Sequence, residues 1–149
     1  MAQDRNSNRV REVMTPNPQC VTEKDSIMDA ARIMQSADTG AVPVVNGKKI
    51  VGMITDRDIV VRLIAEGKDT QNAHVGEAMT KSVRKVDEDS PINEVVELMS
   101  KAQIRRVPVV NRNDEIVGIV SLADLATGTT PTGKVGKTIE EISEGPGNN

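Results

Sequence analysis

The feature that most constrains the fold is a pattern that this chain contains twice. In its first copy, Met14-Thr15 precedes a Val-Pro-Val-Val run at 42–45 and an Ile-Val-Gly run at 50–52. The second copy begins at Met79-Thr80 and repeats both runs at 107–110 and 116–118. Matching positions lie 65 residues apart through the Val-Pro-Val-Val runs, as 79 − 14 gives for the Met-Thr pairs. From the Ile-Val-Gly runs onward they lie 66 residues apart, as 116 − 50 gives. A solenoid needs about three or more copies, so a doubled unit predicts two similar halves.

Each copy is expected to form a βαββα unit, giving an α/β (α+β) fold with the two units packed with pseudo-twofold symmetry. Apolar residues at helical spacing predict one amphipathic helix per copy. Asp25 or Ser26 is available as N-cap of the first helix, and Ser90 as N-cap of the second with Pro91 at its first position. The two apolar stripes are Ile27, Ala30, Ala31 and Met34, then Ile92, Val95, Val96 and Met99.

Two strands and a closing helix follow in each copy. Asn46-Gly47 between runs of β-branched residues indicates a hairpin. A helix is predicted from Thr55 to Gly67, which is a typical residue just past a helix end, and a shorter one from Ser121 to about Thr127. The predicted division is a polar arm at 1–9, a repeat at 10–67, a linker at 68–74, a second repeat at 75–127 and a flexible, glycine-rich tail at 128–149.

Composition excludes several classes of function. The net charge is −3 with interspersed signs, and Phe, Trp and Tyr are absent, so the sequence offers neither a basic surface nor stacking platforms for nucleic acid. One Cys and one His cannot assemble a zinc site of His and Cys ligands or a Ser-His-Asp set, so neither a metal nor a catalytic site is predicted. Without a long apolar run, no membrane partner is expected either. We expect a cytoplasmic protein that is not an enzyme.

The second strand of each copy ends in a hydroxyl residue followed three positions later by Asp, as Thr55-x-x-Asp58 and Ser121-x-x-Asp124. Such a strand-to-helix turn directs free backbone N–H groups toward one place, which favours phosphate. The same spacing also fits a capping box, in which the hydroxyl and the acid bond each other's backbone N–H. Both interpretations stay open, and one residue can serve in both.

In its order and repetition, this set of motifs resembles the CBS domain, and two in tandem resemble a CBS pair, or Bateman module. The string from Thr55 to Val60 is further similar to small stand-alone bacterial CBS-pair proteins. The resemblance implies regulatory binding of AMP, ADP, ATP, S-adenosylmethionine or NAD in clefts between the repeats. It also implies that Asp58 and Asp124 bond ribose hydroxyls and that Thr55 and Ser121 approach phosphate.

Arg105 and Arg106 are candidate counter-charges for phosphate, with Gly40 and Ala41 at the matching positions of the first copy, so the two half-sites are unequal. An ordinary solvated pair of charges is the alternative. Without aromatic side chains, an adenine slot would have to be built from aliphatic ones, which are as suited to a core. The candidates are Val21, Val42, Pro43 and Ile54, with Val86, Val107, Pro108 and Val120 as their equivalents.

The predicted function is a regulatory module that binds an adenosyl ligand and acts through a shape change or a partner protein. The alternative is an interaction module with degenerate pockets. A homodimer is expected, with exposed apolar helix positions such as Val61 and Ile64 as candidates for its interface.

Overall fold

The computed structural model describes residues 8–128; most of the predicted N-terminal arm and nearly all of the predicted tail lie outside this range. The chain divides into two compact units. Unit 1 contains the described parts of Met1–Asn17 and Val117–Asn149 together with Arg84–Arg112. Unit 2 contains Pro18–Val83 and Asn113–Ile116. The packing units therefore divide the chain at different places from the sequence repeats.

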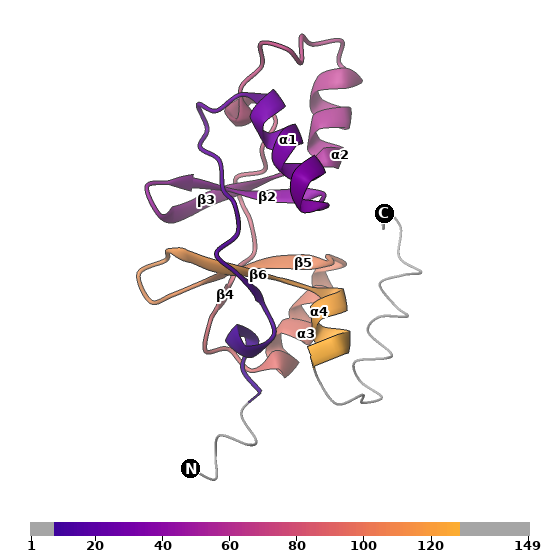
Figure 1. Cartoon of the computed structure of the whole chain (residues 1–149). Coiled ribbons are helices and arrows are strands. Elements are labelled where there is room, and N and C mark those ends of the chain that lie inside the picture. The colour runs from indigo at the N-terminus through magenta and orange to yellow at the C-terminus, as the bar shows by residue number, and fades with distance from the viewer. Residues whose placement is uncertain (1–7, 129–149) are drawn as a thin grey trace. The chain divides into compact units, whose positions relative to one another are not determined.

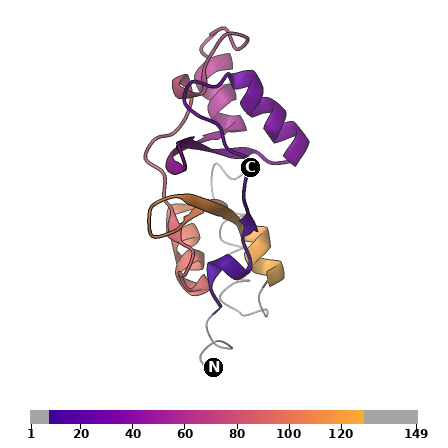
Figure 2. The same ribbon diagram turned by 60° about the vertical axis from the view of Figure 1, so that its left-hand side comes forward.

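Unit 2 is built on a hairpin of β2 (Ala41–Asn46) and β3 (Lys49–Thr55), as predicted. Gly47 in the connecting turn has φ +67°, a conformation that costs glycine nothing. An isolated parallel bridge joins Val21 to Val44 on β2, and an antiparallel bridge joins Thr80 to Met53 on β3. Helices α1 (Ile27–Ala37) and α2 (Asp56–Ile59) lie on one face of the hairpin (Figures 1 and 2).

The predicted first and second helices form, with one departure. Ser26 caps α1, its side chain accepting the N–H of Asp29 at 3.0 Å. After α2 the helix continues as a π-helical segment, η3 (Val60–Ile64), in which the N–H of Ala65 donates to the carbonyl of Val60. Helical periodicity did not predict this wider turn. Val60 is exposed, as are Val61 and Ile64, which were predicted to be, while Leu63 is fully buried. Gly67 ends the helix with φ +71°, as expected.

Unit 1 repeats this plan with a four-stranded sheet in the order β1-β6-β5-β4. Its strands are β1 (Thr15–Pro16), β4 (Val86–Asp87), β5 (Arg106–Val110) and β6 (Ile116–Ser121), and its helices α3 (Ile92–Ala102) and α4 (Leu122–Gly128) share one face of the sheet (Figure 1). β1 pairs antiparallel with β6, and β4 parallel with β5.

The predicted N-cap of α3 is wrong by one residue. Pro91, with ψ 143°, is the N-cap and makes no side-chain cap bond. The reason lies in the preceding turn, which Asp87 closes by accepting the N–H groups of Asp89 and Ser90. Ser90 is thereby held in that turn, and the helix starts at Ile92.

The two Met-Thr segments are exchanged between the repeats. Thr15, from the first repeat, pairs with Ile119 of β6, while Thr80, from the start of the second repeat, pairs with Met53 of β3. Each segment follows a single turn of 3-10 helix, η2 (Val10–Glu12) or η4 (Val75–Glu77), whose first residue is fully buried. Each unit therefore completes its sheet and core with a segment that the sequence assigns to the other repeat.

Glycine makes this exchange possible at both places. A Cβ on Gly52 would lie 2.5 Å from the carbonyl oxygen of Thr80, and one on Gly118 would lie 2.9 Å from that of Thr15. Any larger residue would push the Met-Thr segment off the strand beside it. The Ile-Val-Gly and Met-Thr motifs are thus far apart in sequence but pack directly against each other in the structure.

Aliphatic side chains and methionine fill both cores, as expected of a chain without aromatic residues. The core of unit 2 includes Val21, Val42, Ile54, Leu63 and Met79. The core of unit 1 includes Val10, Val95, Met99, Val107 and Leu125. No helix within residues 8–128 has the length and apolar character needed to cross a membrane.

Candidate functional site

Reciprocal hydrogen bonds form at both strand-to-helix turns. The backbone N–H of Asp58 donates to Thr55 Oγ1 at 3.0 Å, and the N–H of Thr55 donates to Asp58 Oδ2 at 3.0 Å. At the other turn the corresponding distances for Asp124 and Ser121 are 3.0 and 2.9 Å. The capping interpretation is therefore confirmed at both turns, and ligand contact by the same residues stays a prediction.

The cap bonds by themselves use only part of the hydrogen-bonding capacity of a hydroxyl and a carboxylate. Thr55 and Ser121 accept a hydrogen bond through the hydroxyl oxygen, and such a hydroxyl still has its own proton to donate. A carboxylate has about four acceptor positions, of which the cap uses one. Capping therefore does not by itself exclude ligand contact by the residues of either turn.

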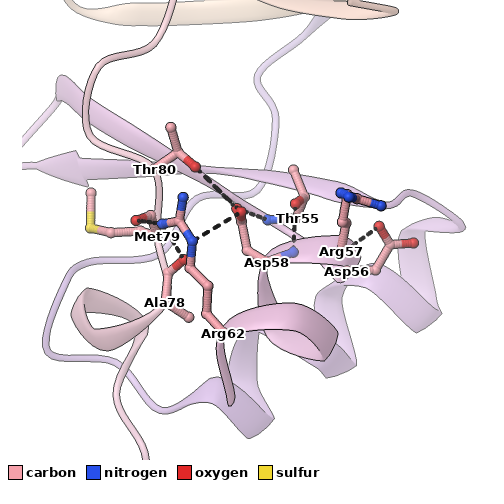
Figure 3. A network of polar contacts seen from close by, with 8 residues as sticks. All are labelled: Thr55, Asp56, Arg57, Asp58, Arg62, Ala78, Met79 and Thr80. Carbon is pink, nitrogen blue, oxygen red and sulfur yellow. Dashed lines mark hydrogen bonds and ion pairs between the residues drawn. The ribbon is translucent and has the colours of Figure 1, made fainter. Parts of the chain in front are cut away.

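Asp58 has further partners, which Figure 3 shows together. The Thr80 hydroxyl lies 3.3 Å from Asp58 Oδ1 and 3.5 Å from Oδ2. Arg62 Nε lies 3.9 Å from Oδ1. The Asp58 side chain is only 13% exposed. Its carboxylate is consequently held from three sides by groups of its own unit.

Arg62 is itself fixed to the exchanged segment. Its Nη1 donates to the carbonyl of Met79 at 2.7 Å and to that of Ala78 at 3.1 Å (Figure 3). Hydrogen bonds from an ionised donor are the stronger kind. Arg62 therefore joins the helix after the motif to the chain just before Thr80, and we call this set of contacts the Arg62 staple.

Sequence reasoning missed both partners of Asp58. Arg62 stands four positions after Asp58, the spacing at which side chains meet on a helix, so this signal was available. In the sequence, Thr80 stands out only as part of the repeated Met-Thr pair. Its contact with Asp58 depends on the segment exchange, which no local pattern indicates.

Arg106 is exposed at the start of β5, beside the second turn. The carbonyl of its neighbour Arg105 accepts the N–H of Leu122, the first residue of α4, at 2.8 Å. In unit 2 the carbonyl of Gly40 accepts the N–H of Asp56 in the same way at 2.9 Å. The predicted cation thus lies on the chain segment bonded to the Ser121 turn, and the first repeat has Gly40 and Ala41 in place of Arg105 and Arg106.

The residues predicted to line an adenine slot belong mostly to the two cores. Val21, Val42 and Ile54 are buried in the core of unit 2, and Val107 and Val120 in that of unit 1. Pro43 and Pro108 are also buried, while Val86 is half-buried against the core of unit 1. These side chains contribute to stability as they stand, and contact with a ligand stays a prediction for them.

The single cysteine is half-buried, and burial raises the pKa of the Cys20 thiol. His74 is exposed, and its backbone N–H donates to Glu77 Oε2. Residues 8–128 contain no group of three or more His, Cys, Asp or Glu side chains that could hold a metal ion.

Comparison with known proteins gives a consistent result. The profile of the CBS domain matches residues 10–65 and 75–128. The chain is 38% identical over 139 residues to the protein YlbB of Bacillus subtilis, covering 92% of this chain and 93% of that one.

Two solved structures extend the comparison. The crystal structure of Hypoxic Response Protein I with two coordinated zinc ions has a TM-score of 0.76 and 35% identity, covering 83% of this chain and 100% of that one. A CBS domain pair in complex with 5′-methylthioadenosine and S-adenosyl-L-methionine has a TM-score of 0.68 and 33% identity, covering 80% of this chain and 98% of that one.

Proposed function

Because this chain belongs to the CBS-domain family and carries two such domains in tandem, we propose that it is a regulatory module that binds an adenosyl ligand. The similar CBS pair crystallised with 5′-methylthioadenosine and S-adenosyl-L-methionine supports this ligand class. AMP, ADP, ATP, S-adenosylmethionine and NAD all carry the adenosyl group. The output is a shape change or binding to an effector protein, and the module acts as a cytoplasmic homodimer rather than as an enzyme.

The observation that carries the proposal is the doubled hydroxyl–carboxylate turn. Asp124 accepts the two ribose hydroxyl protons, and Ser121 donates its hydroxyl proton to phosphate. The cap bonds of 2.9 and 3.0 Å hold both side chains in place before a ligand arrives, which lowers the entropy lost on binding. Thr55 and Asp58 are the equivalent pair of the first repeat.

Arg106 supplies the positive charge for phosphate in the second repeat. It is exposed, so it reaches a ligand without breaking core packing. An ionised guanidinium binds phosphate by short, paired hydrogen bonds. Ligands that carry a phosphate near the ribose are therefore preferred over adenosine itself.

A second candidate function is an interaction module in which both turns only stabilise helices. The low exposure of Asp58 and its three internal partners favour this alternative for the first repeat. This alternative predicts that the folded protein binds no adenosyl ligand.

Isothermal titration calorimetry against AMP, ATP and S-adenosylmethionine tests the proposal, since a chain without Trp or Tyr offers no intrinsic fluorescence for titration. Asp124→Ala is expected to abolish binding and to lower stability by about 1 kcal/mol through the lost cap. Asp124→Asn is the matched variant, because its amide oxygen still accepts the Ser121 N–H but has no negative charge for the ribose hydroxyls. It should keep more of the native stability than Asp124→Ala does and still bind the ligand more weakly than the native chain.

Unchanged affinity in Asp124→Ala, together with the loss of stability, would leave only the capping role. The absence of heat with all three ligands from a folded protein would support the interaction module instead.

A further inference from the structure

The Asn46-Gly47 dipeptide, which forms the hairpin turn between β2 and β3, has a chemical property that the proposed function does not use. Glycine has no Cβ, so its backbone nitrogen approaches the side chain of a preceding asparagine with little steric hindrance. The second repeat has Asn111-Arg112 at the matching positions, 65 residues later, as 111 − 46 gives. The same asparagine is therefore present in both repeats, but glycine follows it only in the first.

Both groups of the dipeptide are accessible in the structure. Asn46 is exposed at the end of β2, and within residues 8–128 its side-chain amide makes no hydrogen bond. Gly47 has φ +67°, and a Cβ built on it would have no atom within 4 Å. Neighbouring side chains therefore do not cover the turn on that side.

A bulge separates the turn from most of the hairpin. The register between β2 and β3 shifts between Val44 and Val45, so only the pairs that follow Val44 lie between the shift and the turn. A bulge locally disrupts the ladder of hydrogen bonds. The chain at Asn46 can therefore change conformation without breaking the pairs on the far side of the bulge.

We infer that Asn46 deamidates spontaneously in the folded chain, and that the isoaspartate product loosens a contact of the turn within unit 2. The Gly47 nitrogen attacks Asn46 Cγ, forms an N–Cγ bond and loses its proton to solvent water, while the Cγ–Nδ2 bond breaks and ammonia leaves. Water then opens the succinimide ring. Breaking the new N–Cγ bond gives aspartate, and breaking the original peptide bond gives isoaspartate. Water is the co-reactant, and no group is oxidised or reduced.

The contact in question joins the turn to Asn113–Ile116, which belongs to unit 2. The carbonyl of Lys48 accepts the N–H of Ile116 at 3.0 Å. In isoaspartate the main chain runs through Cγ and is longer by the one additional atom. This lengthening at Asn46 displaces Lys48, two residues later, and so weakens its bond to Ile116. The net charge of −3 also becomes more negative by one unit.

Peptide mapping of the folded, full-length chain by mass spectrometry tests the first step. After incubation in mildly alkaline buffer, the peptide that contains Asn46 should carry an acid in place of the amide, and its isoaspartate should accept a methyl group from protein-L-isoaspartate methyltransferase. The peptide that contains Asn111 is the internal control and should remain unchanged over the same period. Gly47→Ala should slow the conversion several-fold, because its Cβ obstructs the attack.

Hydrogen exchange tests the second step, after anion-exchange chromatography has separated the modified chains. The Ile116 N–H should exchange faster in the isoaspartate form, while the Thr80 N–H, which donates to the carbonyl of Met53 beyond the bulge, should keep its native rate. Asn46→Asp is the matched control, because it has the added charge on a main chain of normal length. Its Ile116 N–H should exchange at the native rate.

Three results would overturn the inference. Conversion of Asn46 in urea but not in the folded chain would mean that the hairpin keeps the Gly47 nitrogen away from Cγ. Equal rates of conversion at Asn46 and Asn111 would leave the glycine without a role. A native exchange rate of the Ile116 N–H in the isoaspartate form would mean that the turn accommodates the additional atom without loosening its contact.

Discussion

Replacing Gly52 by alanine tests the contact on which the segment exchange depends. The added Cβ would lie 2.5 Å from the Thr80 carbonyl oxygen and still closer to Met79 Cε. A methionine side chain can move, but the Thr80 carbonyl is held because it accepts the N–H of Met53 at 2.9 Å. The N–H of Thr80 also donates to the carbonyl of Met53 at 2.8 Å. The new methyl group can therefore be accommodated only if the 79–80 segment moves away from β3.

The expected cost follows from two opposing effects. Overpacking a rigid site costs up to about 3 kcal/mol. Alanine also lowers the conformational entropy of the unfolded chain relative to glycine, which stabilises the folded state by roughly 0.4–1 kcal/mol. The net loss should be about 2 kcal/mol, which for a chain of this size lowers Tm by roughly 4–8 °C.

Urea denaturation followed at 222 nm measures this loss, and Gly47→Ala is the control. Gly47 has φ +67° and no atom within 4 Å of its added Cβ, so alanine there meets only conformational strain, at about 1 kcal/mol. Hydrogen exchange gives a local readout, because the Thr80 N–H should exchange faster in Gly52→Ala and at the native rate in Gly47→Ala.

A Gly52→Ala chain at least as stable as Gly47→Ala, with a native exchange rate at Thr80, would refute the reasoning. It would mean that the exchanged segment is not held against β3 in the way described.

Two further predictions concern single side chains. Ser26→Ala should destabilise the chain by about 1 kcal/mol, because it removes the acceptor for the Asp29 N–H. Ser36→Ala, on the exposed face of the same helix, is the control and should change the free energy of unfolding by less than about 0.5 kcal/mol. Equal losses in the two variants would argue against the cap. Burial raises the pKa of the Cys20 thiol, so the native chain keeps this proton to a higher pH than the unfolded chain, and the stability associated with it is present below the unfolded pKa and lost as pH rises through the folded one. Alkylation by iodoacetamide at about pH 8.5 should accordingly be slower in the native chain than in urea, and identical rates would contradict the shift.

Much of the candidate site followed from local sequence. Thr55 and Asp58 are three positions apart, and the cap bonds between them depend only on the turn in which both lie. The hairpin at Gly47 and the end of the helix at Gly67 are likewise consequences of residues that tolerate positive φ. Where a local rule failed, as for Ser90, the preceding turn had already engaged that residue, because the N–H of Ser90 donates to the backbone carbonyl of Asp87.

The sequence by itself determined the repeat, the order of the elements and the capped turns, because these arise from contacts a few residues apart. Only the tertiary structure decided that each Met-Thr segment completes the other repeat's sheet, and that Thr80 thereby reaches Asp58. The physical reason is that these contacts join segments far apart in sequence. Their pairing depends on the close backbone approach at Gly52 and Gly118 and on burial in the core of each unit.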